Sequence, residues 1–291
     1  MSKTILNKEI VDIIKREINS LIENNNIVNP VLRNDVFALL EAQDCTVLYY
    51  PLEDAIEGFR IRKYVNGKDE EFIYINTANP EDIQIFTAAH ELGHLINIDQ
   101  IVCNELQMIN VTKKMREDII DRFAAELLLE PESFIKMFKS KVSKYVNEQG
   151  LISGECMIKT IVFLMDFFMV PYDAVVRRLQ ETSRISEEAR DYLLDREKVS
   201  ISLIEKAIEE GKYKRLKPTQ IKSFGELPQL LEKLDDAGVI NERRLQNIME
   251  VFGIKELETY DIPSIDTIQL EKDINNEQYY KGSNYRYRFL K

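Results

Sequence analysis

The segment FTAAHELGHLINI, residues 86–98, restricts the possible fold of this chain more than any other feature. It contains His90 and His94, the only two histidines in 291 residues, with Glu91 beside the first. Residues i and i+4 lie on one face of an α-helix, about one turn apart. Both imidazoles can therefore point at the same place if the segment is helical. The sequence NPED at 79–82, a typical helix start, predicts that helix independently of the histidines.

Two imidazoles at this spacing have the geometry for two ligands of a tetrahedral Zn²⁺ ion. The neighbouring carboxylate of Glu91 can take a proton from the water that such a site activates, so HExxH on a helix combines a metal site with a general base. The alternative is a chance occurrence of the pattern. Against chance, the flanking residues are apolar, and unpaired imidazoles on a buried helix would cost free energy. Gly93 costs about 1 kcal/mol in mid-helix relative to alanine, which indicates close packing by another element.

A third ligand must be a carboxylate or a thiolate, because the chain has no other histidine. The next predicted helix offers Glu117 and Asp121, again four residues apart on one face. In the preferred arrangement Glu117 binds the ion and Asp121 accepts a hydrogen bond from a histidine ring N–H, while the reverse assignment stays open. A purely structural interpretation also exists, since Glu117 and Asp118 are first-turn charges that the helix dipole favours.

Composition places the chain among ordinary globular proteins, with 44% apolar and 31% charged residues. The N-terminus has no signal-like pattern and no apolar run approaches the ~20 residues of a membrane span, so we expect no membrane association. Three widely spaced cysteines do not resemble a disulfide framework, which favours the cytoplasm. A net charge of −11 argues against non-specific coating of nucleic acid by the whole surface.

The periodicity of the sequence predicts an α+β fold that is mostly α. Helical spacing near the N-terminus is followed by three short β-rich segments, from which we expect a small antiparallel sheet of about three strands packed on helices. These segments are 45–50, 58–65 and 71–76, with the hairpin signal Asn66-Gly67 before the last. Helical patterns dominate from Pro80 onward. Residues 211–220 break them as a linker or exposed loop, and a smaller helical region follows at 225–258.

Three stretches of the sequence resemble the ImmA/IrrE family of metallopeptidases: YINTANPEDIQIFTAAHELGHL, EDIIDRFAAELLLEP and MDFFMVPYDAVVRRLQE. The family follows HExxH with a glutamate, an acidic or amide residue four positions later, a Phe-Ala pair and a Leu-Leu run. The matching residues here are Glu117, Asp121, Phe123, Ala124, Leu127 and Leu128. The chain departs from the family at Ile120, where a small residue is usual, and at Pro131, where the proline tends to come one residue earlier. The resemblance spans residues 30–182.

The resemblance implies a zincin-like metallopeptidase domain over residues 1–182, with one Zn²⁺ per chain held by His90, His94 and Glu117. A helical C-terminal region, residues 183–291, would follow as a candidate sensor or regulatory part. Typical targets in such families are helix-turn-helix repressors that control mobile elements, phage defence or stress responses. We therefore predict a cytoplasmic zinc endopeptidase that cleaves such a repressor. A non-catalytic antirepressor with a structural zinc and the protease toxin of a toxin–antitoxin pair are the alternatives.

Further candidate residues come from their position in the sequence. An oxyanion stabiliser, which cannot be a third histidine, is sought in VPYDAVVRRL, where Tyr172 and Arg177 are candidates although both have routine structural explanations. Cys103 lies between the two ligand-bearing helices and could cap the zinc, although a lone cysteine beside apolar residues more often packs in a core. We expect the substrate to extend along an edge strand of the sheet, with 71–76 as the candidate.

The C-terminal segment YYKGSNYRYRFLK, residues 279–291, interleaves aromatic and cationic side chains. This mixture suits single-stranded nucleic acid, which would then be a candidate activator that contacts Tyr285, Arg286, Tyr287 and Arg288. The period-two alternation of the same residues also fits a terminal edge strand or a solvated end, and we favour that interpretation.

Overall fold

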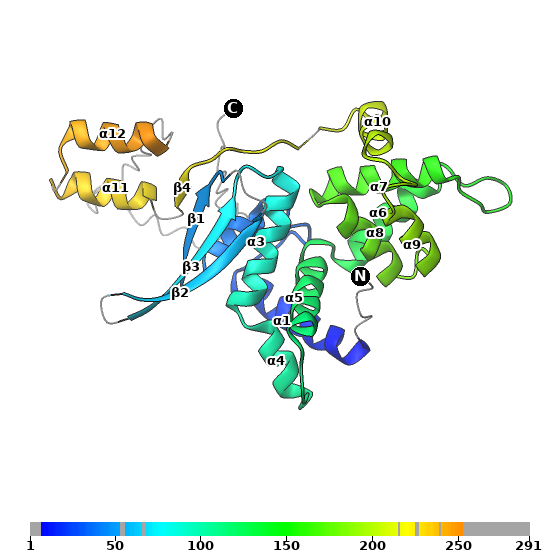
Figure 1. The fold of residues 1–291 in the computed structure, drawn as a ribbon, viewed down its shortest axis with the longest axis horizontal. Coiled ribbons are helices and arrows are strands. Elements are labelled where there is room, and N and C mark those ends of the chain that lie inside the picture. Colours follow the sequence, from blue (N-terminus) through cyan, green and yellow to red (C-terminus); the bar gives the residue numbers. More distant parts are fainter. Residues whose placement is uncertain are drawn as a thin grey trace, which may run out of the picture. The chain divides into compact units, whose positions relative to one another are not determined.

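A computed structural model describes residues 7–52, 56–65, 68–214, 216–224, 227–238 and 240–252, all within one compact unit. As predicted, the fold is α+β and mostly helical (Figure 1). A small sheet lies beside α3, α5 lies beyond α3, and α6 to α10 form a further group of helices. The candidate nucleic-acid contacts Tyr285, Arg286, Tyr287 and Arg288 lie outside the described residues, and their assignment stays a prediction.

The elements agree closely with the predicted segments, except that α4 and β4 were not expected. Their order along the chain is α1 (Lys8–Asn24), α2 (Asp35–Glu41), β1 (Thr46–Tyr50), β2 (Gly58–Val65), β3 (Lys68–Asn76), α3 (Glu81–Leu95), α4 (Ile98–Glu105), α5 (Lys113–Leu128), α6 (Pro131–Val142), α7 (Gly154–Phe168), α8 (Tyr172–Glu181), α9 (Glu187–Leu194), α10 (Ile201–Gly211), β4 (Ser223–Phe224), α11 (Leu227–Asp236) and α12 (Glu242–Phe252). None of the helices among the described residues has the length and apolarity needed to cross a membrane.

The sheet has the strand order β2-β3-β1-β4, with β2 and β3 joined as the predicted antiparallel hairpin. However, β1 runs parallel to β3, with Thr46 opposite Phe72, and β4 runs antiparallel to β1. The expected antiparallel sheet of three strands is therefore a mixed sheet of four, because side-chain alternation does not report strand direction. The prediction of 71–76 as the substrate-binding edge was also wrong. Strand β3 is paired on both sides, and among the described residues the long edge strand is β2, with the two-residue β4 at the other edge.

After α10 the chain returns to the sheet through residues 216–224. The Thr219 hydroxyl donates to Gln84 Oε1 at 3.0 Å, and the backbone N–H of Gln220 donates to the Thr77 carbonyl at 3.0 Å. The Thr77 hydroxyl donates in turn to the carbonyl of Ile221 at 2.7 Å. Part of the expected linker is thus hydrogen-bonded to the β3–α3 junction. The division of the chain at residue 182 stays a prediction.

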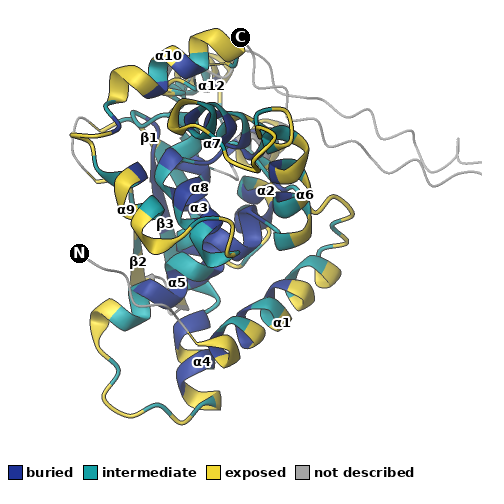
Figure 2. Ribbon diagram, turned by 90° about the vertical axis from the view of Figure 1, so that its right-hand side faces the viewer, coloured by how far each residue is buried: buried dark blue, intermediate teal, exposed yellow. Residues whose placement is uncertain are grey.

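Helices α3 and α5 form the centre of the core, where Figure 2 shows buried residues concentrated. Gly93 explains their close approach, since a Cβ built at this position would lie only 3.0 Å from Phe123 and 3.1 Å from Ile120 of α5. The close packing predicted from Gly93 is therefore present. It brings the histidine-bearing face of α3 against α5.

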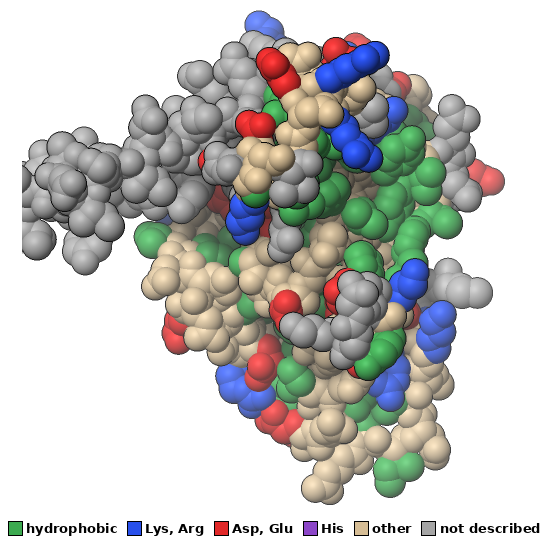
Figure 3. Space-filling model, turned by 90° about the vertical axis from the view of Figure 1, so that its left-hand side faces the viewer, with side chains coloured by type: hydrophobic (Ala, Val, Ile, Leu, Met, Phe, Trp, Pro, Cys, Tyr) green, Lys and Arg blue, Asp and Glu red, His purple; other side chains and the backbone are tan. Residues whose placement is uncertain are grey.

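The side of the molecule that carries the sheet also exposes apolar side chains (Figure 3). The large ones on β1 and β2 are Tyr50, Phe59, Ile61 and Tyr64. Phe59 stacks on Tyr74 of the neighbouring strand, with ring centroids 4.8 Å apart. The described residues therefore cover β2 only partly, on the face toward α3 at Tyr64 and on the opposite face at Phe59 and Ile61.

Candidate metal centre

Helices α3 and α5 bring together the three side chains predicted as metal ligands. His90 Nε2 and His94 Nε2 are 3.1 Å apart. Glu117 Oε2 lies 3.5 Å from the first and 3.4 Å from the second. One potential ligand atom from each residue falls within 4.8 Å of the other two, and all three side chains are half-buried.

The spacing and chemistry of these donors fit Zn²⁺. Bonds of about 2.0–2.2 Å in a tetrahedral arrangement place ligand atoms roughly 3.3–3.6 Å apart, close to the separations of 3.1, 3.4 and 3.5 Å seen here. Two imidazole nitrogens and one carboxylate oxygen form the ligand set of many catalytic zinc sites, which leave a fourth position open. Among the described residues, this is the one group of three histidine, cysteine or acidic side chains that could hold a metal ion.

Asp121 orients the first histidine. Its Oδ1 lies 2.9 Å from His90 Nδ1, and because a carboxylate accepts hydrogen bonds, Nδ1 carries the proton and Nε2 keeps its lone pair for a ligand. Burial lowers the pKa of His90, but the hydrogen bond and charge of Asp121, with the charges of Glu91 and Glu117, outweigh burial and raise it. Burial and the nearby His90 lower the pKa of His94. The predicted contact between Asp121 and a histidine N–H is thus present.

Glu91 lies on α3 beneath the start of β2. Its side chain is only 5% exposed, and burial raises its pKa, partly opposed by the positive charges of His90 and Arg60. A Cβ at Gly58 would approach Thr87 to 2.5 Å and Glu91 Oε1 to 3.7 Å. The absence of a side chain at Gly58 therefore lets the strand pass directly over this carboxyl group. A carboxyl with a raised pKa is suited to taking and returning a proton near neutral pH.

The two predicted oxyanion stabilisers make no hydrogen bond to this centre. Tyr172, at the start of α8, lies with its ring 5.1 Å from the Arg196 guanidinium, and its buried hydroxyl has no hydrogen-bond partner among the described residues. Burial raises the pKa of Tyr172 to about 12. Arg177 is half-buried on α8 and forms no hydrogen bond or ion pair with the described residues. Helix α8 packs mainly on α7 and α9, which explains why neither side chain is bonded to the histidine pair.

Cys103 is also not part of the metal-binding group. It lies on α4 in the apolar core, where it is 7% exposed. Burial raises the pKa of its thiol and so disfavours the thiolate that would bind zinc. Core packing therefore accounts for the position of Cys103, and the zinc-cap role stays a prediction.

Sequence reasoning missed two arginines. Arg60 of β2 donates from Nη1 to the backbone carbonyl of His94 at 2.7 Å, which ties the edge strand to the C-terminal end of the metal helix. Its alternation with Gly58 on the strand is the signal that places both on the side of α3. Arg178, adjacent to the candidate Arg177, is 1% exposed and paired with Glu126 of α5. Its spacing from Val175 places it on the buried face of α8.

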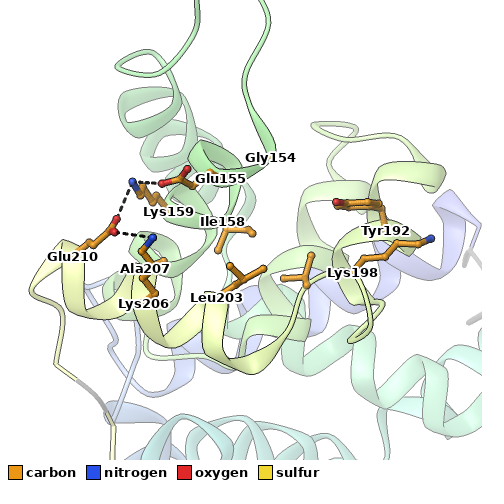
Figure 4. A pocket seen from close by; sticks show the side chains of 11 residues that line it. Gly154, Glu155, Ile158, Lys159, Tyr192, Lys198, Leu203, Lys206, Ala207 and Glu210 are labelled. Atoms are coloured by element: carbon orange, nitrogen blue, oxygen red, sulfur yellow. Dashed lines mark ion pairs between the residues drawn. The ribbon is translucent and has the colours of Figure 1, made fainter.

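A separate cavity of about 240 Å³ lies among α7, α9 and α10 (Figure 4). Its lining includes Lys159, whose ammonium pairs with Glu155 at 2.8 Å and Glu210 at 2.9 Å. The ligand group of α3 and α5 contributes none of the lining residues. The cavity is therefore not part of the metal centre, and the charge of Lys159 is already balanced.

A buried HExxH helix that faces an acidic helix beside a small sheet defines a candidate metallopeptidase of the HExxH class. Residues 40–180 match the model of the IrrE N-terminal-like domain of peptidase family M78. The match contains β1 to β3, α3 and α5, and therefore the complete candidate centre. It agrees with the ImmA/IrrE resemblance of the sequence. No curated protein matches the chain.

Proposed function

We propose that this protein is a zinc-dependent endopeptidase. The observation that carries the proposal is the convergence of His90 Nε2, His94 Nε2 and one carboxylate oxygen of Glu117 within 4.8 Å. Glu91 lies on the same helix, in a position where burial raises its pKa. The family assignment of residues 40–180 supports peptide hydrolysis as the reaction.

The side chains divide the work of the reaction. A Zn²⁺ ion held by His90, His94 and Glu117 would polarise a peptide carbonyl and make water more acidic. The Glu91 carboxylate takes a proton from the attacking water and later returns it to the leaving amine. Asp121 holds the His90 ring in the tautomer that leaves Nε2 free to bind the ion.

The substrate is proposed to lie along the free edge of β2. Its backbone can form hydrogen bonds with that strand and would be held in the extended form that places one peptide bond beside Glu91. We further propose that the natural substrate is a partner helix-turn-helix repressor, because the family resemblance implies targets of that kind. The protein would then act as a cytoplasmic regulator of a mobile element, of phage defence or of a stress response.

The proposal is tested with the full chain, loaded with zinc, and the helix-turn-helix protein encoded nearest to it. We expect cleavage that a chelator abolishes and added Zn²⁺ restores. Glu91→Gln should retain zinc and fold but lose at least about 100-fold in cleavage rate, the usual contribution of a general base. Glu117→Gln is the matched variant, since it should lose zinc as well as activity.

Three results would count against this function. Equal cleavage by Glu91→Gln would remove the proposed general base. Release of the repressor from DNA without cleavage, retained in Glu91→Gln, would indicate a non-catalytic antirepressor. Growth arrest on expression of the chain alone, relieved by a partner that is not cut, would favour a toxin.

A further inference from the structure

The edge strand β2 is unusually cationic for this protein. The chain has a net charge of −11, yet residues 58–65 contain Arg60, Arg62 and Lys63 and no acidic residue. Because no described strand pairs with the outer side of β2, which lies beside the metal centre, these charges lie where an extended substrate would bind. The three cations are divided between the two faces of the strand.

Two of the three cations are on the side of α3. Arg60 contacts the His94 carbonyl and Gly58 lies against Thr87 and Glu91, so both positions face that helix. Successive strand residues alternate between the two faces, which places Arg62 with Arg60. Lys63, an exposed residue, alternates to the opposite face.

The two cations facing α3 share one ion-pair partner, and Arg60 has guanidinium N–H groups left to donate. Glu71 on β3 pairs with Arg62 at 2.6 Å and lies 3.9 Å from Arg60 Nε. Among the described residues, Glu71 is the one carboxylate within ion-pair distance of either guanidinium group, while the charges of Asp69 and Glu91 act on the two arginines from further away. Arg60 uses Nη1 on a neutral carbonyl, while its Nε and Nη2 donate no hydrogen bond to any described residue. Planar guanidinium donors in this state favour a carboxylate.

We propose that Arg60, supported by Arg62, forms a subsite for an acidic side chain of the substrate. This inference rests on the proposed peptidase function. Gly58 lies against Glu91, and Arg60 follows two positions along the same face. A peptide paired with β2 therefore presents an acidic residue to Arg60 about two positions from the residue opposite Gly58.

The opposite face of β2 adds a second preference. Phe59 and Ile61 alternate with the arginines and are 36% and 48% exposed. Neighbouring residues of a bound peptide would place apolar side chains against them. The substrate class is thus an extended segment in which an acidic residue near the cleaved bond alternates with apolar residues.

The experiment uses the zinc-loaded full chain and a peptide library with mass-spectrometric identification of the cut sites. The best-cleaved sequence is then resynthesised with its acidic residue as Asp or Glu, as the matching amide, or as Lys. We expect the acidic form to exceed the amide form about 10- to 100-fold in kcat/KM, the range for a hydrogen bond to a charged group. The same order should appear in binding of labelled peptides to Glu91→Gln protein, measured by fluorescence anisotropy.

Variants of β2 test the assignment. Arg60→Gln should remove the acidic preference, and Arg60→Lys should restore part of it. Arg62→Glu leaves in place the hydrogen bond from Arg60 to the His94 carbonyl. This variant should lower kcat/KM for the acidic peptide and raise kcat/KM for the lysine peptide. Lys63→Glu makes the same change in charge on the opposite face and should leave the preference unchanged. Zinc content and thermal unfolding are measured for each variant.

The outcomes separate this inference from the function on which it rests. Absence of any cleavage, of the library or of a partner protein, overturns both. Cleavage that is equally fast for acidic and amide peptides overturns the subsite alone. An acidic preference that survives in both Arg60→Gln and Arg62→Glu, or that is lost equally in Lys63→Glu, also overturns the subsite.

Discussion

Polar and charged side chains converge at two helix pairs in this molecule, buried at one and half-buried at the other, and their arrangements are opposite. Between α5 and α8, the Arg178 guanidinium donates to both carboxylate oxygens of Glu126, at 2.8 and 2.6 Å, and to the Leu129 carbonyl at 3.0 Å. Between α3 and α5, by contrast, His90, His94 and Glu117 direct lone pairs at one point. The charges of the first cluster pair with one another, whereas the second cluster has the donor set that a metal ion could complete.

The difference distinguishes an acidic residue that stabilises the fold from one that is proposed to bind a metal ion, although both lie on the same helix. Helix α5 contributes Glu126 to the closed cluster and Glu117 to the open one. Arg122 closes the first further, with Glu126 at 2.8 Å and Glu181 at 3.1 Å. Buried charges that pair with each other hold helices in place. Imidazole nitrogens and carboxylate oxygens that converge on one point are instead suited to binding a metal ion. Changes in the two clusters should therefore have different effects.

The largest expected effect is in the closed cluster. Arg178→Ala leaves the Glu126 carboxylate buried without its main partner, which should cost about 3–5 kcal/mol of unfolding free energy in denaturant titration. The double variant Arg178→Met with Glu126→Leu should cost much less, because it removes both charges. A loss below about 1 kcal/mol for Arg178→Ala would show that the cluster is not a structural ion pair.

In the open cluster, Asp121→Asn should lower zinc affinity about 10- to 100-fold, the usual effect of losing the partner of a metal-binding histidine. The stability of the metal-free protein should stay close to that of the wild type. Competition with a chromogenic chelator measures the affinity. Asp12→Asn, at an exposed position of α1, controls for the loss of one negative charge. Equal zinc affinity in both variants would contradict the role of Asp121.

The closed cluster should also make the stability of the protein depend on pH in the acidic range. Burial raises the pKa of Glu126, but the hydrogen bond and charge of Arg178, with the charge of Arg122, lower it below its ordinary value of 4.5. A depressed folded-state pKa contributes stability that is present above pH 4.5 and lost as pH falls through the folded-state pKa. Denaturant titrations from pH 7 to pH 3 should show this loss in the wild type. The Arg178→Met, Glu126→Leu variant should lack that component, and an identical pH profile would refute the prediction.

The smallest effect is expected at Gly93. An added Cβ would press on Phe123 and Ile120, while alanine gains about 1 kcal/mol of helix propensity, so the change in stability should stay within about 1 kcal/mol. Zinc affinity should nevertheless fall, because α3 and α5 must separate by a few tenths of an ångström. Gly154→Ala on α7, with nothing within 4 Å, is the matched control and should leave zinc affinity unchanged.

Much of the open cluster could be predicted because its information is local. The spacing of four residues fixes His90 with His94, and Glu117 with Asp121, on single helix faces. The positions of β2 and of the principal helices also follow from periodicity. The pairing of the two faces was proposed from the need for a third ligand and the acidic pair on the next helix, and the family resemblance strengthened it, since no local rule states which helices meet.

The missed features depend on contacts between distant residues. Arg177 and Arg178 are adjacent and chemically identical, and only the packing of α8 decides which one is buried against α5. Strand β4 has two residues, too few for a periodic pattern, and it exists because the chain returns to pair with β1. The parallel pairing of β1 and β3 likewise requires knowing that β2 occupies the outer position.

The return of the chain at residues 216–224 affects how the protein can be divided. A polypeptide ending at residue 182 would lack β4 and the hydrogen bonds that Thr77 and Gln84 receive or make with this segment. Strand β1 would then become a second edge strand of the sheet, and its unpaired backbone N–H and C=O groups could pair with other chains. The predicted metallopeptidase domain, residues 1–182, thus depends on contacts with residues 216–224. Proteolytic fragments that lack residues 216–224 should aggregate.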